Sequence, residues 1–101
     1  MTFGLSETEY DYLKKNLIER LKKCQAKVFI FGSRATNKHH KFSDIDVLFV
    51  QDPKNPIPSS LTSEILTEFE DSHFPYKIDL VDGSTLAKSY RANIEATRVE
   101  V

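Results

Sequence analysis

The chain has little of several features that define common protein classes. A single cysteine, Cys24, excludes an internal disulfide and a cysteine-rich zinc site, and it fits the reducing conditions of a cytoplasmic protein. No apolar run approaches the ~18–20 residues of a membrane span, and the N-terminus lacks the basic and then apolar pattern of a signal peptide. With 14 basic and 15 acidic residues, the net charge of −1 lacks the basic surplus of a broad nucleic-acid-binding protein.

What the sequence does contain suits one small domain spanning residues 1–101. Forty per cent of the residues are hydrophobic, and seven Phe and four Tyr are enough to build a core. A chain of this length buries only ~60–68% of its unfolded surface, so its stability is expected to be modest. We also expect too little room for a dedicated region that binds a second substrate.

Helical patterns occur in three segments. Ser6 and Glu9 have the spacing of a capping box, and they predict an amphipathic helix over residues 6–25. A proline-rich connector at 51–60 separates a strand from a second predicted helix over residues 60–71. Ser84 is predicted to cap a last helix. The apolar residues at helical spacing in that helix are Leu86, Ala87, Tyr90 and Ile94.

Strand patterns alternate with these helices. Val28–Phe31 is a continuous apolar run that suits a central strand, and Asp44–Val50 and Tyr76–Val81 predict two more. A short helical turn is expected at 34–38. The resulting order α-β-α-β-α-β-α predicts an α/β (α+β) fold, with a small mixed β-sheet flanked by helices.

Three aspartates fall inside these predicted strands. Asp44 and Asp46 are two residues apart and project from one face, and Asp79 interrupts the apolar third strand. Aspartate is a poor strand former and is rarely buried without a partner. Three adjacent carboxylates repel one another, and a divalent cation with a preference for oxygen ligands removes that penalty. We interpret the three as ligands for one or two Mg²⁺ ions, although the first two alone also fit a solvated turn at the start of a strand.

A second candidate feature directly follows the first strand. Gly32 allows a ligand to approach the backbone closely, and the N–H groups of the turn after it can face a phosphate. Ser33 adds a hydroxyl donor, and Arg34 adds a charge that can pair with phosphate. A strand followed by Gly-Ser is a common turn, but together with the three aspartates it supplies both halves of a metal–triphosphate site.

These residues resemble a known signature. Gly32-Ser33, ten intervening residues and Asp44-Ile45-Asp46 are similar to the Gly-Ser-x10-Asp-x-Asp motif of the DNA polymerase β-like nucleotidyltransferase superfamily. The segments around the two halves of this motif, Phe31–Ala35 and Ser43–Val47, look like those of the minimal nucleotidyltransferase (MNT) proteins. Asp79 corresponds to the third carboxylate of the family, and the resemblance covers residues 27–82.

The resemblance implies an enzyme that transfers a nucleotide by a two-metal mechanism. Asp44, Asp46 and Asp79 would be catalytic and would hold Mg²⁺, with Mn²⁺ as an alternative ion. Gly32 and Ser33 would position the β- and γ-phosphates of ATP or another nucleoside triphosphate. An acceptor oxygen would then attack the α-phosphorus, and pyrophosphate would leave.

The resemblance also implies a partner. MNT proteins are typically paired with a helical protein of the HEPN or substrate-binding type, so we expect an antitoxin that transfers AMP to a tyrosine of such a partner. One alternative is an antitoxin that only binds and occludes its partner. Another is a small-molecule nucleotidyltransferase with a separate substrate-binding subunit. In each case the acceptor is expected on another chain, and a homodimer or a hetero-oligomer is left open.

Overall fold

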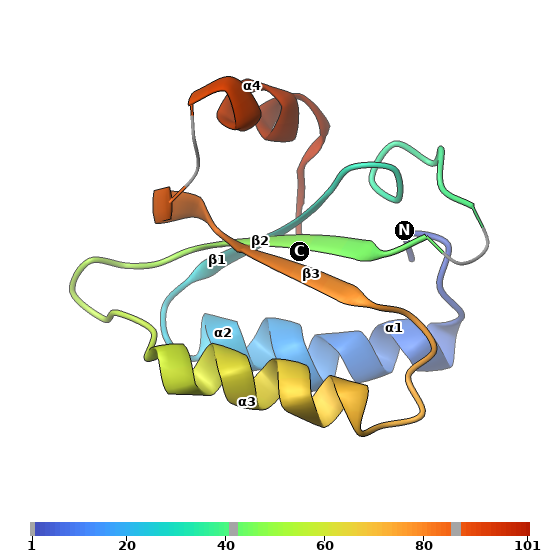
Figure 1. The fold of residues 1–101 in the computed structure, drawn as a ribbon, viewed down its shortest axis with the longest axis horizontal. Coiled ribbons are helices and arrows are strands. Elements are labelled where there is room, and N and C mark those ends of the chain that lie inside the picture. The colour runs from blue at the N-terminus through green and yellow to red at the C-terminus, as the bar shows by residue number, and fades with distance from the viewer. Residues whose placement is uncertain (1, 41–42, 86–87) are drawn as a thin grey trace.

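The computed structural model describes residues 2–40, 43–85 and 88–101, and it has one four-stranded sheet with helices on both faces (Figure 1). The strands are β1 (Lys27–Phe31), β2 (Ile45–Val50), β3 (Ile78–Asp82) and β4 (Val99–Glu100), in the spatial order β3-β2-β1-β4. β1 is antiparallel to both β2 and β4, and β2 is parallel to β3. The predicted mixed sheet with flanking helices is therefore confirmed.

The N-terminal helical segment consists of three parts in succession: α1 (Glu7–Leu13), the π-helical turn η1 (Lys14–Ile18) and α2 (Glu19–Lys22). The predicted capping box is present, because the Ser6 hydroxyl accepts from the Glu9 N–H and the Glu9 carboxylate accepts from the Ser6 N–H. The segment ends three residues earlier than predicted, and Gln25 follows it with a left-handed φ of +65°.

The larger part of the core lies on one face of the sheet, where α3 (Ser59–Glu70) runs beside α1 and α2 (Figure 1). Ile45 and Val47 of β2 point into this core, as the alternation in the sequence predicts. The helical residues that meet them include Leu13, Leu17, Leu21, Ile65 and Phe69.

The opposite face of the sheet is covered by α4 (Lys88–Thr97), which stands apart from the other helices in Figure 1. A smaller apolar cluster holds it there: Phe29, Phe31, Leu48 and Ile94. The third helix is thus confirmed through Ile94, whereas Leu86, Ala87 and the side chain of Tyr90 lie outside the described residues. This face also carries the candidate site.

Three local details complete the comparison with the sequence prediction. Residues 34–38 form a hydrogen-bonded turn rather than a helix, with the Thr36 and Lys38 N–H groups donating to the carbonyls of Gly32 and Ser33. Ser84 lies in the 3₁₀ turn η2 (Gly83–Thr85), and residues 86–87, between this turn and α4, lie outside the described residues. The two-residue strand β4 is too short to leave a periodic signal. Among the described residues, no helix is both long and apolar enough to span a membrane.

Candidate functional site

The structure brings the predicted aspartates together on the face of the sheet that α4 covers. Asp46 is the second residue of β2 and Asp79 the second residue of β3, and the parallel register makes them direct neighbours. Asp44 lies two residues before Asp46. On the other side, Asp46 pairs with Phe31, the last residue of β1. The chain leaves β1 there and enters the Gly32-Ser33 loop, so both predicted halves of the site meet around Asp46.

The electrostatics of Asp46 reflect this crowding. Burial raises the pKa of the Asp46 carboxyl, and the negative charges of Asp79 and Asp44 raise it further. Arg34 acts in the opposite direction and partly offsets the increase. Asp79 and Asp44 are therefore close enough to disfavour the ionised form of Asp46, which is the condition that a bound cation relieves.

The donor set of the site suits a hard cation. Three carboxylates offer only oxygen ligands, and Mg²⁺ prefers oxygen and keeps coordination positions for water and phosphate. In the part of the chain that the structure describes, no three acidic, His or Cys side chains already enclose a metal position. The three carboxylates are thus near one another but are not drawn together around one metal position.

Gly32 is where the loop backbone contacts the aspartate half of the site. Its φ is +77°, in the left-handed region, and a Cβ atom at this position would lie 2.5 Å from Oδ2 of Asp46. Both the conformation and the contact require the absence of a side chain. The loop backbone therefore lies directly against the Asp46 carboxylate, and any larger residue would displace one or the other.

The turn after Gly32 offers backbone donors. The Gly32 N–H itself donates to Oγ1 of Thr97 at the end of α4, over 3.2 Å. In contrast, the N–H groups of Ser33, Arg34 and Ala35 have no acceptor among the described residues, and the Ser33 hydroxyl also has none. Consecutive free N–H groups are the feature by which the first turn of a helix binds anions. The available phosphate donors thus begin at Ser33.

Arg34 has an environment that the sequence did not predict. It is only 1% exposed, and Nε and Nη2 both donate to the Ser43 carbonyl, at 3.1 and 2.9 Å. Nη1 donates to the Phe3 carbonyl at 2.9 Å, and the guanidinium lies 4.5 Å from the centre of the Tyr76 ring. These contacts aim its donors at backbone carbonyls rather than at a phosphate. Arg34 instead ties the Gly-Ser loop to the residue before Asp44 and to the segment that enters β3.

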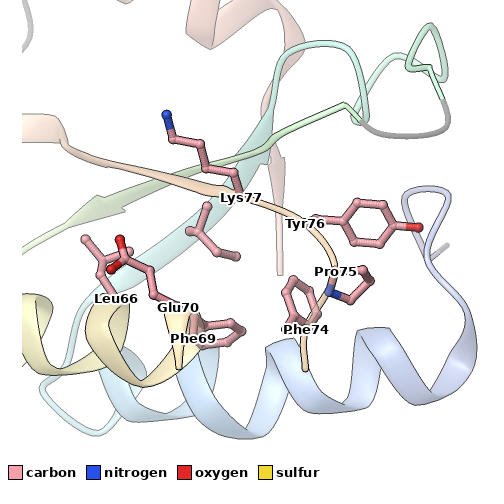
Figure 2. A pocket seen from close by; sticks show the side chains of 8 residues that line it. Leu66, Phe69, Glu70, Phe74, Pro75, Tyr76 and Lys77 are labelled. Atoms are coloured by element: carbon pink, nitrogen blue, oxygen red, sulfur yellow. The ribbon is translucent and has the colours of Figure 1, made fainter. Parts of the chain in front are cut away.

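Lys77 and Thr97 add to the predicted set. Lys77 lies two residues before Asp79, and Figure 2 shows its side chain extending away from α3, towards the face that carries the carboxylates. The pocket in Figure 2, of about 290 Å³, lies between β3 and α3 on the opposite face, so it is separate from the aspartates. Thr97 lies 65 residues from Gly32 in the sequence, and no local pattern could have linked the two.

Comparison with known sequences gives the family of the chain. Residues 15–101 match the family model described as Polymerase beta, Nucleotidyltransferase. A curated relative, the probable protein adenylyltransferase MntA of Haemophilus influenzae, is 28% identical over 74 residues, which are 73% of this chain and 63% of the relative. The match thus spans less than two thirds of that protein.

Comparison with solved structures supports the fold. A chain in the crystal structure of a toxin–antitoxin with AMP-PNP superposes with a TM-score of 0.65 at 18% identity, covering 86% of this chain and 70% of that chain. A chain in the tri-AMPylated Shewanella oneidensis HEPN toxin in complex with MNT antitoxin gives 0.57 at 17% identity, covering 87% and 68%. At this level of identity the similarity establishes a common fold.

Proposed function

Because this chain belongs to the Polymerase beta nucleotidyltransferase family, we propose that it transfers AMP from ATP to a tyrosine hydroxyl of a separate HEPN-type helical protein. In this proposal the reaction requires Mg²⁺, and the chain acts as the antitoxin of its partner. The observation that carries the proposal is the meeting of Asp44, Asp46 and Asp79 beside a loop with free N–H donors. Support for a protein acceptor comes from the name of the Haemophilus relative and from the AMPylated HEPN toxin in one complex of similar fold.

In the proposed reaction, the chain's own residues divide into three groups. Asp44 and Asp46 would hold Mg²⁺, which would supply positive charge to the triphosphate and to the departing pyrophosphate. The N–H groups that begin at Ser33 bind the β- and γ-phosphates. Asp79 completes the carboxylate cluster, orients the acceptor hydroxyl and accepts its proton. The hydroxyl oxygen forms a bond to the α-phosphorus as the bond to pyrophosphate breaks.

Arg34 acts indirectly in this proposal. Its three donors fix the Ser43 carbonyl, immediately before Asp44, and the Phe3 carbonyl near the N-terminus. It thereby holds the loop and the start of β2 at a constant separation, which is the preorganisation that electrostatic catalysis needs. An occluding scaffold gains nothing from confining three repelling carboxylates, so the cluster favours transfer over binding alone.

The proposal predicts transfer of label to a partner. Incubation with Mg²⁺, ATP labelled at the α-phosphate and a HEPN-type protein from the same genome is expected to label a tyrosine of that protein, whereas ATP labelled at the γ-phosphate leaves it unlabelled. Asp46→Asn should abolish labelling, and Asp71→Asn, an exposed carboxylate after α3, should not change it.

Two outcomes would contradict this function. Neutralisation of the partner that persists without any label, and also in Asp46→Asn, would indicate an antitoxin that only occludes. Label that appears on a small molecule and never on the protein would indicate a small-molecule nucleotidyltransferase.

A further inference from the structure

A small hollow lies between α4 and the sheet, on the same face as the three aspartates. Its volume is about 190 Å³, and Leu48 and Val50 of β2 form its floor. Three charged residues line it from above: Arg91 and Glu95 of α4, and Arg98, which directly follows that helix. The volume is below the ~300–1,000 Å³ of sites that enclose a whole small molecule, so the hollow suits one part of a larger ligand.

The lining of the hollow is unusual for a helix that packs on a sheet. Arg91 and Glu95 are one turn apart on α4 and flank the buried Ile94, and Arg98 directly follows the helix. Charged residues normally lie on the opposite side of such a helix. Val50 is the one large apolar side chain that is exposed in the described part of the chain, at 37%. Val50 therefore leaves part of the apolar floor uncovered, next to charged groups.

This combination matches a flat heterocycle. One of its faces can cover the exposed Val50, while its edge offers hydrogen-bond donors and acceptors to Glu95 and the arginines. Arg98 is already oriented, because its guanidinium lies 4.6 Å from the centre of the Phe29 ring.

The position of the hollow relative to the candidate site identifies the heterocycle. Leu48 follows Asp46 by two residues on the same face of β2, a separation of ~7 Å at the usual rise of a strand. The Gly32-Ser33 loop lies on the other side of Asp46, because Phe31 pairs with Asp46 and the chain then runs towards Asp44. Along the sheet, the loop with the free N–H groups thus comes first, the carboxylates follow, and the hollow comes last.

A nucleoside triphosphate has the same order: terminal phosphates, α-phosphorus, ribose and base. We propose that the hollow under α4 binds the nucleobase of the donor nucleotide, an inference that rests on the proposed function. Glu95 then accepts a hydrogen bond from an exocyclic amino group of the base. Adenine, guanine and cytosine carry such a group and uracil does not, so the pocket discriminates against UTP.

Binding measurements with three ligands test this assignment without depending on turnover. Calorimetry with Mg²⁺ would compare ATP, UTP and inorganic triphosphate on the wild type. ATP is expected to bind at least about 10-fold more tightly than either UTP or triphosphate, because a hydrogen bond to a charged group is worth that factor.

Variants of the hollow should remove this advantage selectively. Val50→Asp places a charge on the apolar floor and should reduce ATP affinity to that of triphosphate, and Glu95→Ala should bring ATP close to UTP. Glu70→Ala, an exposed glutamate of α3 on the opposite face, is the matched control and should keep the wild-type pattern. If a variant binds triphosphate with the same affinity as the wild type, that variant is folded.

The assignment is overturned if ATP and triphosphate bind equally to the wild type, or if Val50→Asp keeps the advantage of ATP. Either result leaves the metal–triphosphate site intact. If neither ATP nor triphosphate binds the wild type, the result contradicts the proposed function and also the proposed base site.

Discussion

Replacing Asp46 by asparagine is expected to lower nucleotidyl transfer by at least ~100-fold, because removal of one group that stabilises transition-state charge costs about that factor or more. Asparagine keeps the size of the side chain and the fit against Gly32 but loses the negative charge that holds the cation. The measurement is the initial rate of label transfer at saturating ATP. Activity within 10-fold of wild type would remove Asp46 from the catalytic group.

The same substitution should leave the metal-free protein at least as stable as the wild type. Since the pKa of Asp46 is raised in the folded state, the folded protein binds this proton more tightly than the unfolded chain does. Stability contributed by the protonated group is therefore lost as the pH rises through the raised pKa. In EDTA, the free energy of unfolding of wild type relative to Asp46→Asn should fall between pH 4 and pH 7. A relative rise would contradict the crowded-carboxylate interpretation, and Asp71→Asn serves as the control.

Replacing Arg34 by lysine is expected to lower the free energy of unfolding by ~2–4 kcal/mol, the range for breaking a buried, charged hydrogen-bond network. Lysine keeps the charge, but a single ammonium cannot reproduce the planar fork that reaches both the Ser43 and Phe3 carbonyls. The measurement is urea unfolding monitored by circular dichroism. Arg20→Lys is the matched control, since Arg20 pairs with Glu64 and Glu68 at the surface and should change stability by less than ~1 kcal/mol.

This comparison separates two roles for Arg34. If Arg34 bound phosphate, as its place after Gly-Ser in the sequence suggested, lysine would preserve stability and would mainly weaken nucleotide affinity. If it positions the loop, the free energy of unfolding of the lysine variant falls even in the absence of nucleotide. A stability change no larger than that of Arg20→Lys would therefore overturn the positioning role.

The contrast between Arg34 and the aspartates shows what the sequence can predict. Asp46 and Asp79 attract attention because a strand rarely tolerates such residues, and the period of two assigns their face. Both signals are local, and the pairing of β2 with β3 then brings the two residues together. The capping box at Ser6 is predictable for the same reason, since its partners are three residues apart.

The remaining features depend on distant contacts. Arg34 reaches Phe3 across 31 positions, and Gly32 reaches Thr97 across 65, so neither partner could be inferred from neighbouring residues. The sequence does not distinguish an arginine at position 34 that binds phosphate from one that is buried and holds the loop in place. The hollow under α4 likewise exists only because Arg91 and Glu95 fold back over Leu48 and Val50.

The most direct test of the central claim is a crystal structure with Mn²⁺ and a non-hydrolysable ATP analogue, in which anomalous scattering locates the metal. The account predicts manganese bound to Asp46 and to at least one of Asp44 and Asp79, with the terminal phosphates against the N–H groups that begin at Ser33. Nucleotide bound elsewhere, or bound here without manganese on these carboxylates, would contradict it.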